Sequence, residues 1–166
     1  MWYYIYSLIT APGVMAHECS HLIFCWLSGV KVHKVKLFQF GHVAGYVVHD
    51  EPQKFSQGFA ISFGPIIINT LAALMLFSQV ETPWNRVWPF VAAWLGITFG
   101  LHAIPSDGDA LTLWHLFKHR FKKNPLIIIG LPFIPFLYLL NFLKRLHIDW
   151  LFTALLFWLG AIYLKK

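Results

Sequence analysis

The chain of 166 residues carries little charge, and negative charge is the scarcest. Only 12% of its residues are charged and 7 are acidic, whereas 58% are hydrophobic. So few charged side chains do not cover the surface of a soluble domain of this size. We therefore expect an integral membrane protein, with the lipid bilayer as its immediate partner.

Cysteine is scarce too, and recognisable processing signals are missing. Cys19 and Cys25 are the two cysteines, and residues six apart on a helix face different sides, so we expect no disulfide. The first apolar segment has neither a basic start nor an A-x-A-like cleavage site, so we expect it to stay in the protein. No repeat, low-complexity linker or change of composition divides the chain, which predicts one domain over residues 1–166.

The net charge of +6 does not indicate a nucleic-acid partner. Basic residues flank apolar runs instead, which is typical of lysines and arginines next to a membrane. Two such groups are Lys118, Arg120, Lys122 and Lys123, and, after the last apolar run, Lys165 and Lys166. We expect no nucleic acid among the partners.

The apolar segments predict an all-α polytopic membrane protein with about five transmembrane helices. The expected spans cover about residues 2–29, 56–80, 87–104, 125–143 and 150–164. After the first span, Val30–Val48 mixes apolar and basic residues in loose alternation, which predicts a small β-ribbon. The mixed segment Asp107–Lys123 is expected to form a helix that emerges from the membrane at a basic surface.

The distribution of lysine and arginine predicts an N-terminus on the outer side of the membrane. Only Arg86, Lys144 and Arg145 then lie outside. Ten others face the cytoplasm, namely Lys31, Lys34, Lys36, Lys54, Lys118, Arg120, Lys122, Lys123, Lys165 and Lys166. This orientation places the end of the first span, and the motif within it, toward the cytoplasmic side.

That motif is His17-Glu18-Cys19-Ser20-His21, which lies inside the first apolar segment. Two histidines four residues apart share one face of a helix and can hold one zinc ion. The glutamate beside the first histidine can act as a general base toward water, as in H-E-x-x-H metallopeptidases. Because ionisable residues inside a membrane span are costly, their presence favours a functional role.

A catalytic zinc also needs a third protein ligand and an open coordination position. Asp107, in Pro105-Ser106-Asp107-Gly108, follows the third expected span and is the predicted ligand. Two neutral histidines and one carboxylate leave a zinc complex of low net charge, which suits an apolar site. Asp109 projects about 200° away from Asp107 around a helix and is the alternative ligand.

These segments resemble the site-2 protease family of intramembrane zinc metalloproteases. Three motifs carry the resemblance, in the family's order: His17-Glu18-x-x-His21, Gly64-Pro65-x-x-x-Asn69 in the next span, and Pro105-Ser106-Asp107-Gly108. A β-ribbon after the first motif is also a feature of that family. The resemblance covers about residues 10–115, the expected catalytic core, whereas the transmembrane helices expected in 125–164 are not diagnostic.

The resemblance implies a zinc metalloendopeptidase with one Zn²⁺ per chain. It implies His17, His21 and Asp107 as zinc ligands, Glu18 as the catalytic base and Asn69 as a substrate-binding residue. The substrate would be a membrane protein, cut within or near a transmembrane segment, which is the reaction of regulated intramembrane proteolysis.

Each motif also has a structural interpretation. The Gly64-Pro65 pair can be a helix kink, and Asn69 can form an interhelical hydrogen bond. Ser106 can cap the helix that follows it, with Asp109 completing a capping box. The functional alternative to a protease is a non-catalytic membrane protein that binds zinc for transport or sensing.

Overall fold

The computed structural model describes residues 2–41, 43–81, 86–122 and 124–163. These residues are mostly helical and contain one two-stranded antiparallel sheet, as the sequence predicts. In chain order the elements are α1 (Trp2–Leu27), β1 (Val32–Lys36), β2 (Tyr46–His49), α2 (Phe55–Phe77), α3 (Trp88–Leu101), α4 (Asp107–Arg120), the 3₁₀-helix η1 (Pro125–Gly130), α5 (Phe133–Lys144), α6 (Ile148–Phe157) and the π-helical turn η2 (Trp158–Tyr163).

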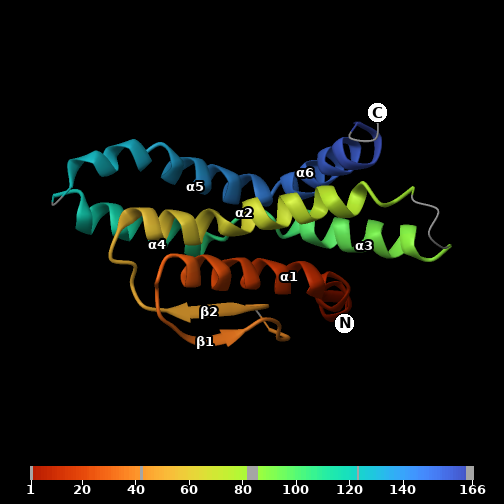
Figure 1. Ribbon diagram of the computed structural model, residues 1–166, viewed down its shortest axis with the longest axis horizontal. Helices are drawn as coiled ribbons and strands as arrows, with labels where there is room; N and C mark the ends of the chain where they lie inside the picture. Colours follow the sequence, from red (N-terminus) through yellow and green to blue (C-terminus); the bar gives the residue numbers. More distant parts are fainter. Residues whose placement is uncertain (1, 42, 82–85, 123, 164–166) are drawn as a thin grey trace.

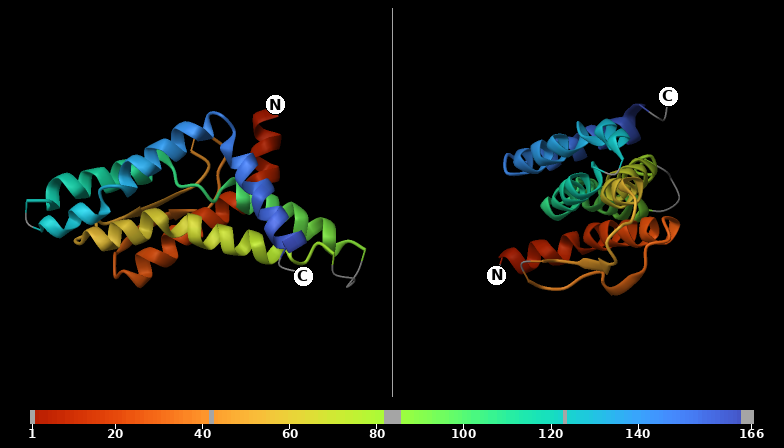
Figure 2. Two further views of the ribbon diagram at one scale, coloured as in Figure 1. Left: turned by 90° about the horizontal axis from the view of Figure 1, so that it is seen from above. Right: turned by 90° about the vertical axis from the view of Figure 1, so that its left-hand side faces the viewer.

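Helices α2, α3 and α4 lie along the long axis of the molecule (Figure 1). The two longest helices, α1 and α2, pack against each other, and α1 crosses α2 obliquely (Figure 2). Along α2, α3 covers one half and α4 the other, so these two helices follow one another end to end (Figures 1 and 2). α5 packs on α4 and α6 packs on α3, with a bend between α5 and α6 (Figure 2). Two interruptions of the helical path therefore meet near the middle of the molecule.

Each interruption has a local cause in the sequence. Between α3 and α4, Pro105 has no backbone N–H and disfavours a helical conformation at Ile104. Ser106 then starts α4 as its N-cap, with Asp109 as capping-box partner. Between α5 and α6, His147 adopts a left-handed conformation with φ of 59°, which turns the chain into α6.

The predicted β-ribbon is the hairpin of β1 and β2, which lies beside α1 (Figure 1). Its strands pair in the register Val35 to Val47, with an irregularity after Val32. At its base, His33 Nε2 donates to an Asp50 carboxylate oxygen at 2.6 Å, and this hydrogen bond lowers the pKa of Asp50. The sheet therefore holds a defined position next to the helix that carries the H-E-x-x-H motif.

Many large hydrophobic side chains are exposed, and several polar side chains are buried. Large hydrophobic side chains such as Trp26, Met75 and Phe90 are 78%, 71% and 77% exposed, respectively. Buried polar residues include Ser20, Asn69 and Thr98. Exposed apolar side chains of this size and number are consistent with a surface that contacts lipid, while the clusters of buried residues remain mainly hydrophobic.

Two helical segments are long and apolar enough to cross a membrane, namely α2 and the stretch Ile127–Lys144. α3 and the stretch Ile148–Tyr163 are apolar but shorter. α1 has 26 residues, yet the polar side chains of its H-E-x-x-H motif lower its hydropathy. Length and composition thus mark two of the five expected spans.

Candidate metal centre

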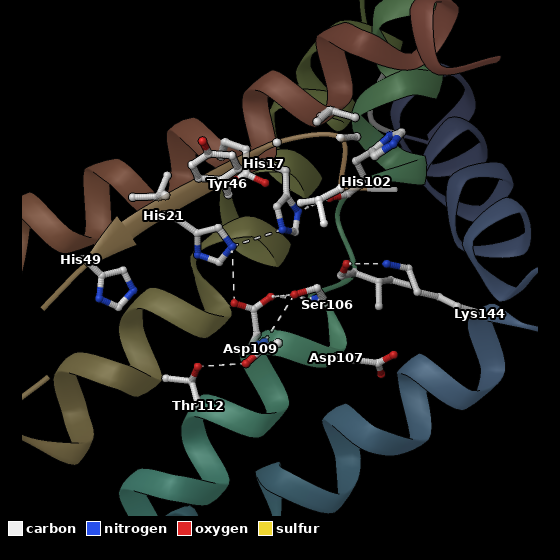
Figure 3. A pocket seen from close by; sticks show the side chains of 18 residues that line it. His17, His21, Tyr46, His49, His102, Ser106, Asp107, Asp109, Thr112 and Lys144 are labelled. Carbon is white, nitrogen blue, oxygen red and sulfur yellow. Dashed lines mark hydrogen bonds and ion pairs between the residues drawn. The ribbon is translucent and has the colours of Figure 1, made fainter. Parts of the chain in front are cut away.

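The two motif histidines face each other on one side of α1. His17 and His21 are four residues apart, so the helical repeat brings their rings together, in an edge-to-face arrangement with an interplanar angle of 76°. Their Nε2 atoms lie 3.2 Å apart (Figure 3). The helix thus presents two imidazole nitrogens at one point, as the sequence predicts.

Backbone carbonyls fix the protonation of both rings. His17 Nδ1–H donates to the His102 carbonyl at 2.7 Å, and His21 Nδ1–H donates to the Ile61 carbonyl at 3.0 Å. A carbonyl oxygen only accepts, so the proton of each neutral ring is on Nδ1. Both Nε2 atoms then carry lone pairs, which is the tautomer that binds a metal.

Asp109, in the first turn of α4, offers a third candidate ligand atom. Its Oδ1 lies 3.4 Å from His21 Nε2. Its Oδ2 accepts hydrogen bonds from the backbone N–H and the hydroxyl of Ser106, both at 2.7 Å. From α2, the hydroxyl of Ser62 donates to the Asp109 carbonyl at 3.2 Å. One carboxylate oxygen thus completes the capping box while the other faces the histidines.

This geometry differs from the prediction that Asp107 is the third ligand. Among the described residues, the side chains that bring three ligand atoms within 4.8 Å of one another are His17, His21 and Asp109. Asp107 lines the same cavity, but its carboxylate points away from the histidine pair (Figure 3). The physical reason is the helical repeat, which turns residues two positions apart to different sides.

The donor set fits a tetrahedral zinc ion. Two nitrogen lone pairs and a carboxylate oxygen at 3.2 and 3.4 Å repel one another unless a proton or a metal ion lies between them. Zinc bonds of about 2.0–2.2 Å in tetrahedral geometry separate neighbouring ligand atoms by about 3.3–3.6 Å. The observed separations of 3.2 and 3.4 Å are close to this range.

Glu18 lies beside this ligand group and is 9% exposed. It lines the same cavity as His17, His21 and Asp109, but it is not one of the three converging ligands. Gly45, in the loop before β2, packs directly on it, since a Cβ atom there would lie 2.7 Å from Glu18 Cγ. The hairpin therefore confines the carboxylate next to the candidate metal centre.

The centre opens into a cavity of about 860 Å³. One wall comes from α1 and the hairpin, including Tyr46 and His49 (Figure 3). The opposite wall comes from the α3–α4 break, the first turns of α4, and Lys144 at the end of α5. A cavity of this volume with one ligand cluster in its wall can hold both a peptide segment and water.

Asn69 has a different place from the one that the resemblance implies. Its side chain is fully buried in α2 and is not part of the cavity lining. Its Nδ2 donates to the His102 carbonyl at 3.1 Å and to the Gly13 carbonyl at 3.4 Å, and its Oδ1 accepts from Ser20 at 3.4 Å. Asn69 thus joins α1, α2 and the end of α3, which is the interhelical interpretation of this residue.

We expect Asn69→Leu to lower the free energy of unfolding by about 1–3 kcal/mol, because the buried polar groups that bond to the Asn69 amide lose their partner. On the predicted peptidase function, the change should reduce kcat more than it raises KM, since it disturbs the carbonyl that orients His17. Asn141→Leu is the matched control, because the buried amide nitrogen of Asn141 meets no partner among the described residues. Normal stability and a raised KM in Asn69→Leu would instead support the substrate-binding role that the resemblance implies.

Sequence reasoning missed the part played by Lys144. The charge count places this residue on the outer surface, but its Nζ donates to the Ile104 carbonyl at 3.0 Å beside the cavity. Its position at the end of an apolar helix was the available signal, since a lysine inside a membrane protein has a specific partner. Of the basic residues assigned to the cytoplasm, Lys123, Lys165 and Lys166 lie outside the described residues.

Comparisons with protein-family models, with curated proteins and with solved structures found no significant match. The functional argument for this chain therefore rests on the chemistry and geometry of its own residues.

Proposed function

We propose that this protein is an intramembrane zinc metalloprotease of the site-2 protease type. It would hydrolyse a peptide bond within or near a transmembrane segment of another membrane protein. The observation that carries the proposal is the convergence of His17 Nε2, His21 Nε2 and Asp109 Oδ1 within 4.8 Å in the wall of the cavity that Glu18 also lines. Three ligands with an open side and an adjacent carboxylate are the parts that metal-assisted hydrolysis needs.

The arrangement of the helices suggests four membrane passes in place of the five expected. α1 and α2 each cross once, and at 1.5 Å per residue the 23 residues of α2 extend about 35 Å. The pairs α3–α4 and α5–α6 each cross as two half-helices joined at an interruption. Non-helical backbone at membrane depth is tolerated where it lines a cavity, and the α3–α4 break does so.

In this arrangement the centre lies within the membrane and water reaches it from the basic end. The hairpin, the start of α2 and the end of α4 carry Lys31, Lys34, Lys36, Lys54, Lys118, Arg120 and Lys122. Arg86 lies just before α3, at the other end of the molecule. The excess of basic residues at the hairpin end favours a cytoplasmic location for that end. Four passes then leave the end of α6 on the outer side, in contrast to the cytoplasmic C-terminus of the five-span prediction.

The proposed reaction is hydrolysis with Glu18 as the proton carrier. Zinc, when bound by His17, His21 and Asp109, polarises the peptide carbonyl and makes the attacking water more acidic. Glu18 accepts a proton from that water as its oxygen bonds to the carbonyl carbon. Glu18 then gives this proton to the leaving amine as the carbon–nitrogen bond breaks. The carbonyls of His102 and Ile61 keep both imidazoles in place throughout.

The proposed substrate enters in an extended conformation. A transmembrane helix shields its carbonyls in hydrogen bonds, so it must unwind locally before attack. Tyr46, Val47 and His49 of β2 line the cavity. Since β2 pairs with β1 alone in the described sheet, its second edge is open to main-chain hydrogen bonds from such a segment.

Metal removal and return test this proposal. The protein purified in detergent should contain one zinc per chain and should cleave a reporter peptide that carries a transmembrane segment. A chelator should abolish turnover, and Zn²⁺ should restore it. Mg²⁺ should not, because it prefers oxygen ligands in an octahedral shell. Undiminished cleavage by metal-free protein would contradict the proposal.

A further inference from the structure

Lys144 reaches the candidate metal centre from α5, a helix outside the predicted catalytic core. Its Nζ donates to the Ile104 carbonyl at 3.0 Å, in the break between α3 and α4. Figure 3 shows its side chain extending along the cavity wall toward this break, close to Ser106. The contact joins segments that are 40 residues apart in the sequence.

The Ile104 carbonyl belongs to backbone that forms no continuous helix. An unsatisfied carbonyl in such a place is costly in a membrane protein, so a donor from another helix stabilises this conformation of the break. Two residues further, the N–H and hydroxyl of Ser106 hold Asp109 Oδ2. Lys144 therefore anchors the short segment on which the orientation of the third ligand depends.

The charges around the cavity support the same role. Lys144 is the single lysine or arginine among the described residues that line the cavity, and Glu18, Asp107 and Asp109 line it too. The opposite charges that act on its ammonium group are those of Asp149, Asp109 and Asp107. Unbalanced charge is unfavourable in surroundings of low polarity, so loss of Lys144 leaves the site with excess negative charge.

We propose that Lys144 is a positioning residue for the metal centre, which it acts on by holding the α3–α4 break at Ile104. The inference rests on the proposed zinc site, but not on the identity of the substrate. It extends the functional unit beyond residues 10–115 to α5, because the break that presents Asp109 is held from that helix.

The test compares zinc affinity in three full-length variants purified in detergent. Lys144→Met keeps the length of the side chain and removes its donors and charge, and should weaken zinc binding by about tenfold or more, as outer-shell changes do. Lys144→Arg keeps a charged donor, so its zinc affinity should stay within about threefold of that of the unchanged protein, which is well below the tenfold loss expected for Lys144→Met. Arg145→Met is the control, because Arg145 is exposed and next in sequence, and it should have no effect.

Zinc competition with a chelator of known affinity gives the readout, and thermal unfolding reports the fold separately. Unchanged affinity in Lys144→Met would overturn the inference, as would equal losses in the Met and Arg variants. If the Met variant does not fold, Lys144→Gln replaces it. Its amide is too short to reach Ile104, so wild-type zinc affinity there would also overturn the inference. Because zinc binding is measured without substrate, absence of protease activity leaves this result intact.

Discussion

Glu18→Gln should abolish peptide cleavage while zinc remains bound. Glutamine keeps the shape of the side chain but does not accept a proton from water, and general-base catalysis contributes about 10²- to 10⁴-fold in rate. Zinc should remain because Glu18 is outside the group of His17, His21 and Asp109. The measurement is kcat/KM on a reporter peptide together with the zinc content of the same preparation.

Glu51→Gln is the matched control for this prediction. Glu51 is exposed in the segment between the hairpin and α2, so its loss should leave turnover and zinc content unchanged. The comparison also separates the two functional hypotheses. A zinc transporter or sensor needs no general base, so its zinc-dependent behaviour would survive in Glu18→Gln. Full cleavage by Glu18→Gln would refute the hydrolytic mechanism.

The sequence predicted those parts of the site that follow from local periodicity. The four-residue spacing of His17 and His21 places both rings on one face of any helix, whatever packs around it. The alternation in Val30–Val48 likewise predicted a two-stranded sheet, and the structure contains one. Ser106 and Asp109 match the pattern of a capping box, which the structure also contains.

The remaining parts depend on contacts between distant segments. The backbone carbonyls of Ile61 and His102 fix the histidine tautomers. Every residue has such a carbonyl, so the sequence does not indicate which of them accept these hydrogen bonds. The role of Asn69 depends on which neighbouring groups its amide meets in the packed bundle. The end-to-end arrangement of α3 and α4 could not be predicted either, because hydropathy indicates which segments are apolar and not how they are oriented relative to one another.

The sequence also does not decide between Asp107 and Asp109, which lie in the same turn of α4. From the sequence, a capping role for Asp109 argues against a ligand role. In the structure the two roles use different oxygens, since Oδ2 accepts from Ser106 and Oδ1 faces His21. The capping hydrogen bonds thus orient the carboxylate toward the histidines.

Asp109→Asn should therefore remove zinc while preserving the fold. The amide oxygen of asparagine can still accept a hydrogen bond from Ser106, so α4 keeps its N-terminal cap. Its other terminal atom becomes an uncharged NH₂ group, which does not bind zinc. Changes to residues that only support a ligand weaken metal binding by roughly 10- to 100-fold. Loss of a direct ligand should weaken zinc binding by more than this, and peptide cleavage should cease as well.

Asp107→Asn is the control that isolates ligation from helix electrostatics. Asp107 and Asp109 both lie in the first turn of α4, at the positive end of the helix dipole. Either substitution therefore removes one negative charge from the same end of the helix. The difference in zinc affinity between the two variants then reports which carboxylate holds the metal. We expect Asp107→Asn to keep one zinc per chain and most of its activity, because its carboxylate points away from His17 and His21. Zinc loss in Asp107→Asn with full binding in Asp109→Asn would assign the ligand to Asp107.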